Sequence, residues 1–189
     1  MAMTLAQPLA TAISSEPPRP ISLEEYLQHP PQSMEWVDGS LEKKAVTLRH
    51  ANIQARLSSA WGTFLKAHSL GGKIYTEAVC RTLKQGRRPD IAYLPADLAE
   101  QYADAVSLPH SFPLIAEIAS PEDAAEALLL KAQEYLQSGG REVWLVFPES
   151  QRILVITASR EVWFTALETA KTQIELPGFA ISVAELVGE

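Results

Sequence analysis

The sequence predicts an α/β fold, with a central mixed β-sheet flanked by helices, in one domain over residues 21–189. Three observations predict this class: segments with helical and extended patterns alternate, residues 114–118 are almost entirely apolar, and glycine or proline follows most segments. A strand as apolar as 114–118 is covered on both faces, as strands are in sheets that lie between helices. A content of 47% hydrophobic and 21% charged residues is typical of a globular domain.

The first half of the chain predicts a helix, a hairpin and a second helix. A short helix is expected at "ISLEEYLQ", where Ser22 is placed to cap its first turn. Asp38-Gly39 separates two extended segments and is a strong hairpin signal. Apolar residues recur at helical spacing over 51–67, and Gly71-Gly72 is expected to end that helix. Residues 1 to about 20 show no sustained period, so we expect a flexible N-terminal arm there.

The second half predicts mainly strands, with one more helix before the last three. A turn at Gln85-Gly86 is expected to lead into a strand over 91–94. The alanine, leucine, lysine and glutamate content of residues 123–137 favours a helix there, and Gly139-Gly140 should end it. The remaining expected elements are strands over 73–83, 91–94 and 114–118, a short helix or a loop over 96–104, a helix over 123–137, and three strands over 141–147, 152–159 and 160–167.

Charge and cysteine content restrict the function classes. A formal net charge of −7 argues against a general nucleic-acid binder, because phosphate binding depends on clustered lysine and arginine. A local cluster can override the sum, and four basic residues within eight positions lead into Pro89-Asp90: Arg81, Lys84, Arg87 and Arg88. Lys43, Lys44 and Arg49 form a second, weaker group. Both groups could instead be merely solvated faces.

The compartment is predicted to be the cytoplasm. Cys80 is the only cysteine, so the chain has no internal disulfide, and no cysteine or histidine pairing gives a zinc motif. The first residues lack the basic region of a signal peptide. No apolar run approaches the roughly 18 to 20 residues that span a bilayer, so no membrane association is expected.

Two carboxylates on expected strands indicate chemistry. Pro89 has no amide hydrogen and belongs at the start of a strand, so it presents Asp90 there. Glu117 lies inside the covered strand, where a carboxylate is costly unless it is paired, hydrogen-bonded or bound to a metal. Carboxylates from neighbouring strands can hold a hard divalent cation and leave positions for water and a substrate phosphate. We therefore expect a Mg²⁺ site, with Mn²⁺ as a substitute.

A lysine would complete such a site by stabilising charge on the phosphate. Ala119 stands two residues after Glu117, so the strand supplies none. If the helix over 123–137 doubles back along the strand, Lys131 returns to the level of Glu117, at ~1.5 Å per helical residue and ~3.3 Å per strand residue. Tyr135, one turn further on, shares that face of the helix.

At these residues the sequence resembles the restriction-endonuclease-like family known as Uma-two, or domain of unknown function eight-twenty. The resemblance covers roughly residues 20 to 185 and is carried by "MEWVDGSL", His50, "RRPDIAYL", "PLIAEIASPED" and "KAQEYLQSGGREVWLV". It implies the restriction endonuclease-like fold of the PD-(D/E)xK nucleases, with metal-dependent hydrolysis of DNA phosphodiester bonds.

The resemblance also implies roles for individual residues. Pro89-Asp90 matches the first element of the nuclease motif and Glu117 the second. Ala119 departs from the motif at the lysine position, and the family's other members with a lysine moved to the following helix point to Lys131. Glu35 of "MEWVDG" matches the family's hairpin glutamate, which is expected near the metal.

Each of these assignments has a structural alternative. Asp90 could cap a turn, Glu117 could be the ion-pair partner of Lys131 without any function, and Lys131 could be an exposed helix residue. Glu35 could face solvent from its hairpin. His50 could contact phosphate or act as a base, or be a surface imidazole.

The remaining candidates concern substrate and assembly. Arg87, Arg88, Lys84 and Tyr135 join His50 as candidates for contacting DNA, although Tyr135 could serve only packing and one hydrogen bond. The alternative to an endonuclease is a catalytically silent nuclease-fold protein that acts as a binding or assembly module. The β-rich C-terminal third offers surface for pairing two subunits, so a homodimer is predicted.

Overall fold

The computed structural model describes residues 20–44 and 46–188. The N-terminal arm expected over residues 1 to about 20 lies outside the described residues, apart from Pro20. Within the described ranges, no helix combines the length and the apolar character needed to cross a membrane.

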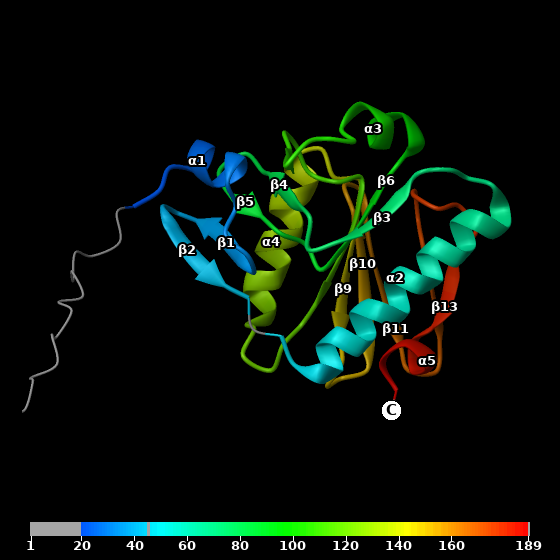
Figure 1. Ribbon diagram of the computed structural model, residues 1–189. Coiled ribbons are helices and arrows are strands. Elements are labelled where there is room, and N and C mark those ends of the chain that lie inside the picture. The colour runs from blue at the N-terminus through cyan, green and yellow to red at the C-terminus, as the bar shows by residue number, and fades with distance from the viewer. Residues whose placement is uncertain (1–19, 45, 189) are drawn as a thin grey trace, which may run out of the picture.

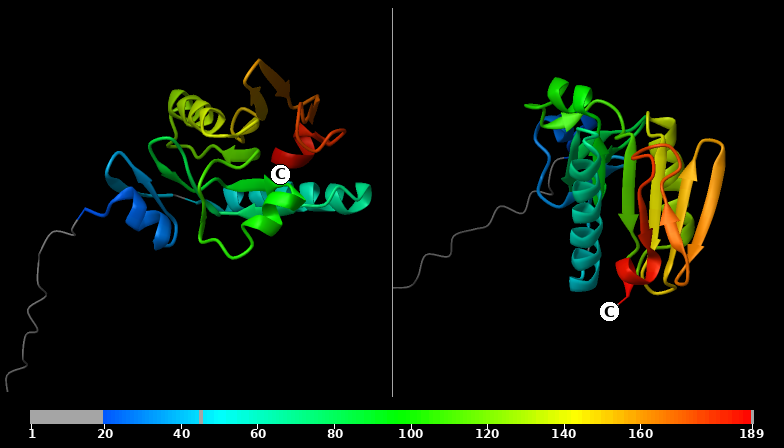
Figure 2. Two further views of the ribbon diagram at one scale, coloured as in Figure 1. Left: turned by 90° about the horizontal axis from the view of Figure 1, so that it is seen from above. Right: turned by 90° about the vertical axis from the view of Figure 1, so that its right-hand side faces the viewer.

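A six-stranded mixed sheet forms the centre of the molecule, with one long helix on each face (Figures 1 and 2). All neighbouring strands are antiparallel except β8 and β9, which are parallel. The strand order is β11 (Arg160–Thr165), β10 (Arg152–Thr157), β9 (Glu142–Phe147), β8 (Leu114–Ile118), β6 (Ile91–Leu94) and β3 (Lys73–Thr76). The predicted α/β fold with a mixed sheet between helices is confirmed.

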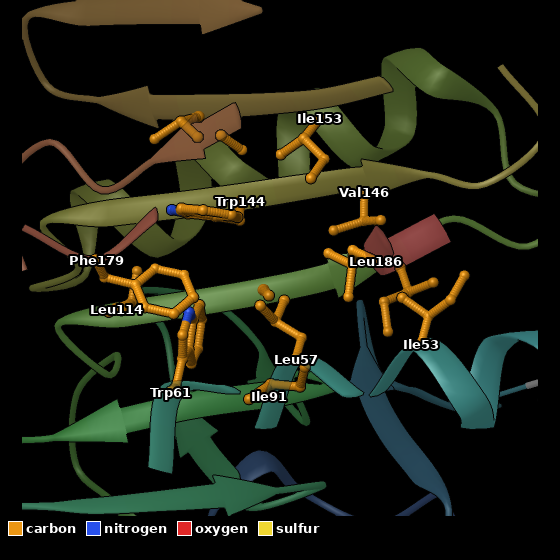
Figure 3. Close-up of a cluster of buried hydrophobic side chains, with 14 of the residues drawn as sticks. Ile53, Leu57, Trp61, Ile91, Leu114, Trp144, Val146, Ile153, Phe179 and Leu186 are labelled. Atoms are coloured by element: carbon orange, nitrogen blue, oxygen red, sulfur yellow. The ribbon is translucent and has the colours of Figure 1, made fainter. Parts of the chain in front are cut away.

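The two helices bury separate apolar clusters. On one face, α2 (Leu48–His68) packs Ile53, Leu57 and Trp61 against the sheet, together with the short C-terminal helix α5 (Val183–Val187). Figure 3 shows this cluster, in which the rings of Trp61 and Trp144 meet edge to face with centroids 6.1 Å apart. On the other face, α4 (Ala125–Gln137) covers the sheet. Trp144 is thus a fully buried core residue.

A second, smaller sheet lies beside the first and carries the predicted hairpin. Its strand order is β2 (Ser40–Lys43), β1 (Met34–Val37), β5 (Gly86–Arg87), β4 (Val79–Arg81) and β7 (Ser107–Leu108). Helix α1 (Leu23–Gln28) packs against this sheet, with Tyr26 fully buried. The remaining elements are α3 (Ala96–Gln101) and a two-stranded sheet of β12 (Thr169–Lys171) and β13 (Ala180–Ser182).

Local signals in the sequence account for several boundaries. The Ser22 side chain accepts from the amide of Glu25 at 3.1 Å and caps α1 as predicted. Asp38 and Gly39 both have positive φ, at 47° and 89°, as a tight hairpin turn of this kind requires. The expected helix or loop over 96–104 is a helix that ends at Gln101.

Three details of the expected elements were wrong. The expected strand over 73–83 is two strands in different sheets, because Glu77 adopts φ 56° and turns the chain between β3 and β4. Helix α2 ends at His68, where Ser69 forms the C-cap with a left-handed φ of 52°, so the helix stops before the glycine pair. Gly86 belongs to strand β5 rather than to a turn; a Cβ on it would stand 2.4 Å from the ring of Tyr26, so only glycine allows that approach.

Candidate active site

Adjacent antiparallel strands bring Asp90 and Glu117 together. Ile91 of β6 pairs with Ala116 of β8, so the residue before Ile91 and the residue after Ala116 lie opposite each other. The Asp90 carboxylate accepts from the amide of Ile118 at 2.7 Å, which ties it to the end of β8. Both carboxylates are buried, with 1% exposure for Asp90 and 3% for Glu117. The proline-led strand start and the apolar strand therefore meet at one point of the sheet.

Asp90 is neutralised by two basic side chains. The Lys44 ammonium contacts Oδ1, and Nε2 of His50 lies 3.0 Å from Oδ2. Burial raises the pKa of Asp90, but the charge of Lys44 and the hydrogen bond to His50 outweigh it and hold that pKa well below its usual range. Asp90 is therefore a carboxylate at neutral pH and not a neutral acid.

Glu117 receives two groups from helix α4. Nζ of Lys131 lies 3.0 Å from its Oε1, and the Tyr135 hydroxyl donates to the same oxygen at 2.6 Å. Burial raises the pKa of Glu117, and the charges of Lys131 and Lys44 offset it only in part. Helix α4 runs back along β8, so the geometry predicted for Lys131 and Tyr135 is confirmed.

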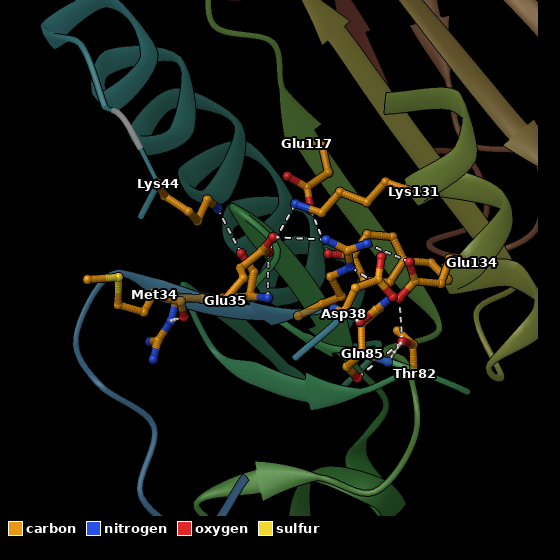
Figure 4. A network of polar contacts seen from close by, with 12 residues as sticks. Met34, Glu35, Asp38, Lys44, Thr82, Gln85, Glu117, Lys131 and Glu134 are labelled. Carbon is orange, nitrogen blue, oxygen red and sulfur yellow. Dashed lines mark hydrogen bonds and ion pairs between the residues drawn. The ribbon is translucent and has the colours of Figure 1, made fainter. Parts of the chain in front are cut away.

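Glu35 of the hairpin completes the cluster. Its Oε1 lies 3.0 Å from Nζ of Lys131 and accepts from the amide of Arg88 at 2.8 Å, while Oε2 lies 3.3 Å from the guanidinium of Arg87. Burial raises the pKa of Glu35, but Lys131, Lys44 and Arg87 together lower it below its ordinary value. Glu35 thus faces the site rather than solvent, and Lys131 bridges it to Glu117 (Figure 4).

The cluster lines one cavity, which we call the carboxylate cavity after Glu35, Asp90 and Glu117. It has a volume of about 470 Å³. Its other charged or polar lining residues are Glu42, Lys43, Lys44, His50, Arg87, Ser120, Glu122, Asp123 and Lys131. His50, predicted to touch substrate, therefore lies in the wall of the cavity and is itself bound to Asp90.

The predicted phosphate-contacting arginines are engaged within the chain. Arg87 forms a two-pronged contact with Glu134, at 3.1 and 2.6 Å, beside its contact with Glu35. Arg88 donates to the backbone carbonyls of Met34, Glu77 and Pro31. These side chains brace the hairpin against β5 and α4.

Lys84 lies apart from the cluster. It is exposed on the loop between β4 and β5 and is not among the cavity-lining residues. A DNA contact from Lys84 would therefore be made outside the carboxylate cavity.

Three residues that contact the cluster were missed from sequence, namely Lys44, Glu77 and Gln54. Lys44 was grouped only with a weak basic patch, and Glu77 gave no signal, yet Lys44 also lies 3.3 Å from Glu77 Oε1 and 2.7 Å from the Arg88 carbonyl. Gln54 of α2 donates to the Asp90 carbonyl at 2.8 Å. Periodicity carries no information on such contacts, because Lys44 follows a strand and Glu77 lies in a left-handed turn.

The cavity contains the type of ligand that a divalent cation takes, but its carboxylates are not arranged around a common point as metal ligands are. Carboxylate and carbonyl oxygens are the ligands that Mg²⁺ takes in proteins, and Asp90 and Glu117 supply them. Among the described residues, no group of three or more histidine, cysteine, aspartate and glutamate side chains is placed to hold a metal ion. The carboxylates are held instead by Lys44 and Lys131.

Comparison with known proteins defines the class and the family. A crystal structure described as "a putative nuclease belonging to DUF820" from Anabaena variabilis superimposes with a TM-score of 0.77 at 19% identity, over 89% of this chain and 98% of that one. The fold is therefore a nuclease-like α/β fold. The chain belongs to the Uma2 family, whose model, described as "putative restriction endonuclease", matches residues 23–184. This confirms the resemblance found in the sequence. No curated protein matches the chain.

Proposed function

We propose that this protein is a Mg²⁺-dependent endonuclease that hydrolyses DNA phosphodiester bonds, with Mn²⁺ as a substitute metal. The observation that carries the proposal is the convergence of three buried carboxylates and Lys131 in one cavity, where the start of strand β6 meets the end of strand β8. Burying these charges is costly, and such clusters concentrate at functional sites. Membership of the Uma2 family supports the same reaction.

In this proposal, Asp90 and Glu117 hold the metal through their carboxylate oxygens. A bound divalent cation supplies an acidified water and offsets charge on the scissile phosphate. The chain's own residues position the groups: Tyr135 fixes one oxygen of Glu117 by its 2.6 Å hydrogen bond, and His50 fixes one oxygen of Asp90. These contacts fix the orientation of both carboxylate groups.

Lys131 and Glu35 act on the substrate side. The Lys131 ammonium stabilises the negative charge that grows on the phosphate as water attacks in line. Glu35, held as a carboxylate by Lys131 and Arg87, accepts a hydrogen bond from the attacking water and orients it. The positive charges of Lys44, Arg87 and Lys131 in the cavity offset part of the repulsion between DNA and a chain of net charge −7.

Cleavage of DNA tests the proposal. Linear, supercoiled and single-stranded DNA are incubated with purified protein and Mg²⁺ or Mn²⁺, and the wild type is compared with Asp90→Asn and Glu117→Gln. Both changes keep side-chain shape and remove the charge that holds the metal, so we expect cleavage to be lost. Glu161→Gln, on the exposed part of β11, is the matched control and should cleave like the wild type. Cleavage that persists in both site variants contradicts the proposal.

A second candidate is a catalytically silent protein that keeps the nuclease fold as a binding or assembly module. The observation in its favour is that Lys44 and Lys131 already neutralise the carboxylates. Titration calorimetry with Mn²⁺ separates the two candidates. Binding by the wild type that is lost in Glu117→Gln supports the enzyme, and absence of binding supports the silent module.

A further inference from the structure

The Lys44 ammonium lies among three oxygens, one from the turn at Glu77 and two from the segment that leads into β6. It contacts Oδ1 of Asp90, the carbonyl oxygen of Arg88 at 2.7 Å and Oε1 of Glu77 at 3.3 Å. An ammonium group has three hydrogens, so this set matches its donors in number. The side chain is 12% exposed and lines the carboxylate cavity.

The same three oxygens form a donor set for a divalent cation. Two carboxylates and a backbone carbonyl are hard oxygen ligands, and Mg²⁺ or Mn²⁺ takes such ligands together with water. A lysine ammonium can neutralise the same carboxylates with a single positive charge, and it does so without the cost of removing water from a metal ion. Lys44 therefore stands where a cation is needed to neutralise Asp90.

The residues that carry these oxygens have further hydrogen bonds that do not involve Lys44. Gln54 of α2 donates to Oε1 of Glu77 at 3.4 Å and to the Asp90 carbonyl at 2.8 Å. The Arg88 guanidinium fixes the Glu77 carbonyl at 2.7 Å, and Glu77 is turned toward the site by its φ of 56°. The Asp90 carboxylate is held as well by the amide of Ile118 and by His50, so both carboxylates keep partners if the ammonium withdraws.

Lys44 itself is attached from another direction. It follows strand β2 in the small sheet, and its backbone amide donates to the Ser33 carbonyl at 3.1 Å. Its long side chain alone reaches the oxygens, so a change of side-chain rotamer is enough to remove the ammonium without moving a strand or helix.

We infer that Lys44 is an intramolecular counter-ion that competes with the divalent cation for Asp90, and that Glu77 and the Arg88 carbonyl become metal ligands when its ammonium withdraws. The inference rests on the proposed metal-dependent function. It adds two metal ligands to that proposal, and it implies that competition from Lys44 lowers the affinity for the metal. It accounts for a cavity rich in carboxylates in which, among the described residues, no finished metal cluster is present.

Calorimetric titration with Mn²⁺ tests the inference on Lys44→Met, with Lys43→Met as the matched control. Lys43 is the exposed neighbour of Lys44 on the same cavity wall, so its loss removes the same charge without freeing Asp90. We expect Lys44→Met to bind Mn²⁺ at least about tenfold more tightly than the wild type, while Lys43→Met changes affinity little. In the double variant Lys44→Met/Glu77→Gln, most of that gain should be lost because one ligand is missing.

The outcomes separate this inference from the proposed function. Equal or weaker binding by Lys44→Met, with binding by the wild type intact, overturns the inference and leaves the endonuclease proposal standing. Absence of binding in the wild type and in every variant overturns both.

Trace acetylation of the wild-type protein with acetic anhydride gives a second measurement that needs no variant. Mass spectrometry follows each lysine peptide with and without saturating Mn²⁺. We expect acetylation of Lys44 to rise severalfold as Mn²⁺ displaces its ammonium, while acetylation of Lys66, exposed on α2, stays constant. Labelling of Lys44 that does not change at saturating Mn²⁺ overturns the inference.

Discussion

The ammonium of Lys131 lies 3.0 Å from Oε1 of Glu117, although one residue belongs to helix α4 and the other to strand β8. Ala119 stands at the strand position where the motif implied by the sequence resemblance has its lysine. Helix α4 returns along the strand and brings its own lysine to the same carboxylate, as the proposed endonuclease site requires.

Lys131→Met should remove the charge that stabilises the phosphate while leaving the metal ligands in place. We expect cleavage to fall by about 10²-fold or more, the scale on which single electrostatic contacts act in a transition state. The affinity for Mn²⁺ should not decrease, because the change removes a positive charge next to Glu117 and Glu35. DNA cleavage and Mn²⁺ calorimetry on the same preparation measure both. Lys66→Met, on the exposed side of α2, is the control, and unchanged cleavage in Lys131→Met contradicts the role.

Tyr135→Phe should act through Glu117. The hydroxyl donates to the buried carboxylate at 2.6 Å, and a hydrogen bond to a charged group contributes about 1.5–3 kcal/mol. Its loss destabilises the charged form, so the pKa of Glu117, already raised by burial, rises further. We expect a lower free energy of unfolding at neutral pH and an acidic limb of the cleavage profile that moves to higher pH. Urea unfolding and pH–rate profiles measure the two effects.

The matched control for this change is Tyr102→Phe. Tyr102 follows helix α3, where its ring meets that of His110, and lies away from the carboxylate cavity. Equal shifts in the two variants would show that loss of a hydroxyl, and not its contact with Glu117, is responsible.

The parts of the site that the sequence predicted are those tied to regular elements. Asp90 was identified because proline starts its strand, and Glu117 because it interrupts an apolar one. Lys131 followed from the rise per residue of a helix and a strand. Each of these inferences needs only local pattern and standard geometry.

The parts that were missed depend on contacts between distant segments. The basic run containing Arg87 and Arg88 gave no sign that Glu134 and three backbone carbonyls would occupy both guanidinium groups. The break between β3 and β4 arises at Glu77, a residue type that is uncommon at positive φ and therefore gives no turn signal. Lys44 was overlooked for a related reason, since a side chain that reaches out of a loop follows no period.

His50 predicts a pH dependence of stability. Burial lowers the pKa of His50, but the hydrogen bond and charge of Asp90 outweigh it, so the pKa is raised above its ordinary value of about 6.5. A group with a raised folded-state pKa contributes stability below its unfolded pKa, and this contribution is lost as pH rises through the folded pKa. We expect the Tm of the wild type to fall as pH rises above about 6.5, and this component to be absent in His50→Gln.

Differential scanning calorimetry across that pH range measures the effect. His29→Gln is the control, because His29 is exposed at the end of α1. If His50→Gln and the wild type show the same pH dependence, the contact with Asp90 does not stabilise the protonated imidazole.

Arg87 is predicted to hold the site together. Its side chain is 12% exposed and that of Glu134 is 20% exposed, so Arg87→Met leaves two carboxylates largely buried with fewer partners. Removing one member of a buried pair costs about 3–5 kcal/mol, and replacing both members is much less harmful. We expect Arg87→Met to be strongly destabilised in urea and Arg87→Met/Glu134→Met to recover part of the loss.

The exposed pair of Arg81 and Glu24 provides the comparison, and Arg81→Met should change stability little. If instead Arg87→Met keeps the stability of the wild type but lowers DNA affinity with a reduced salt dependence, Arg87 contacts phosphate as the sequence first suggested.

The structure leaves strand β11 as the main candidate surface for the predicted homodimer. Strands β9 and β10 are buried within the chain's own sheet, which uses most of the apolar strand that suggested pairing. Strand β11 is at the edge of that sheet, where Trp163 is 50% exposed and its ring stacks on that of Phe147 with centroids 5.7 Å apart. An unpaired edge strand with an exposed aromatic ring favours pairing with a second copy.

Sedimentation equilibrium at tens of micromolar decides whether that edge is used. A stable interface buries about 800 Å² on each partner, and Trp163 with the free edge of β11 would lie at its centre. We therefore expect a dimer that Trp163→Lys converts to a monomer, because a charge would be buried at the contact, while Leu48→Lys, at a residue 92% exposed at the start of α2, leaves the dimer intact. A single wild-type species near the chain mass of 20.7 kDa contradicts the dimer. In that case each binding event would place one carboxylate cavity on DNA, and nicks in one strand should precede any double-strand break.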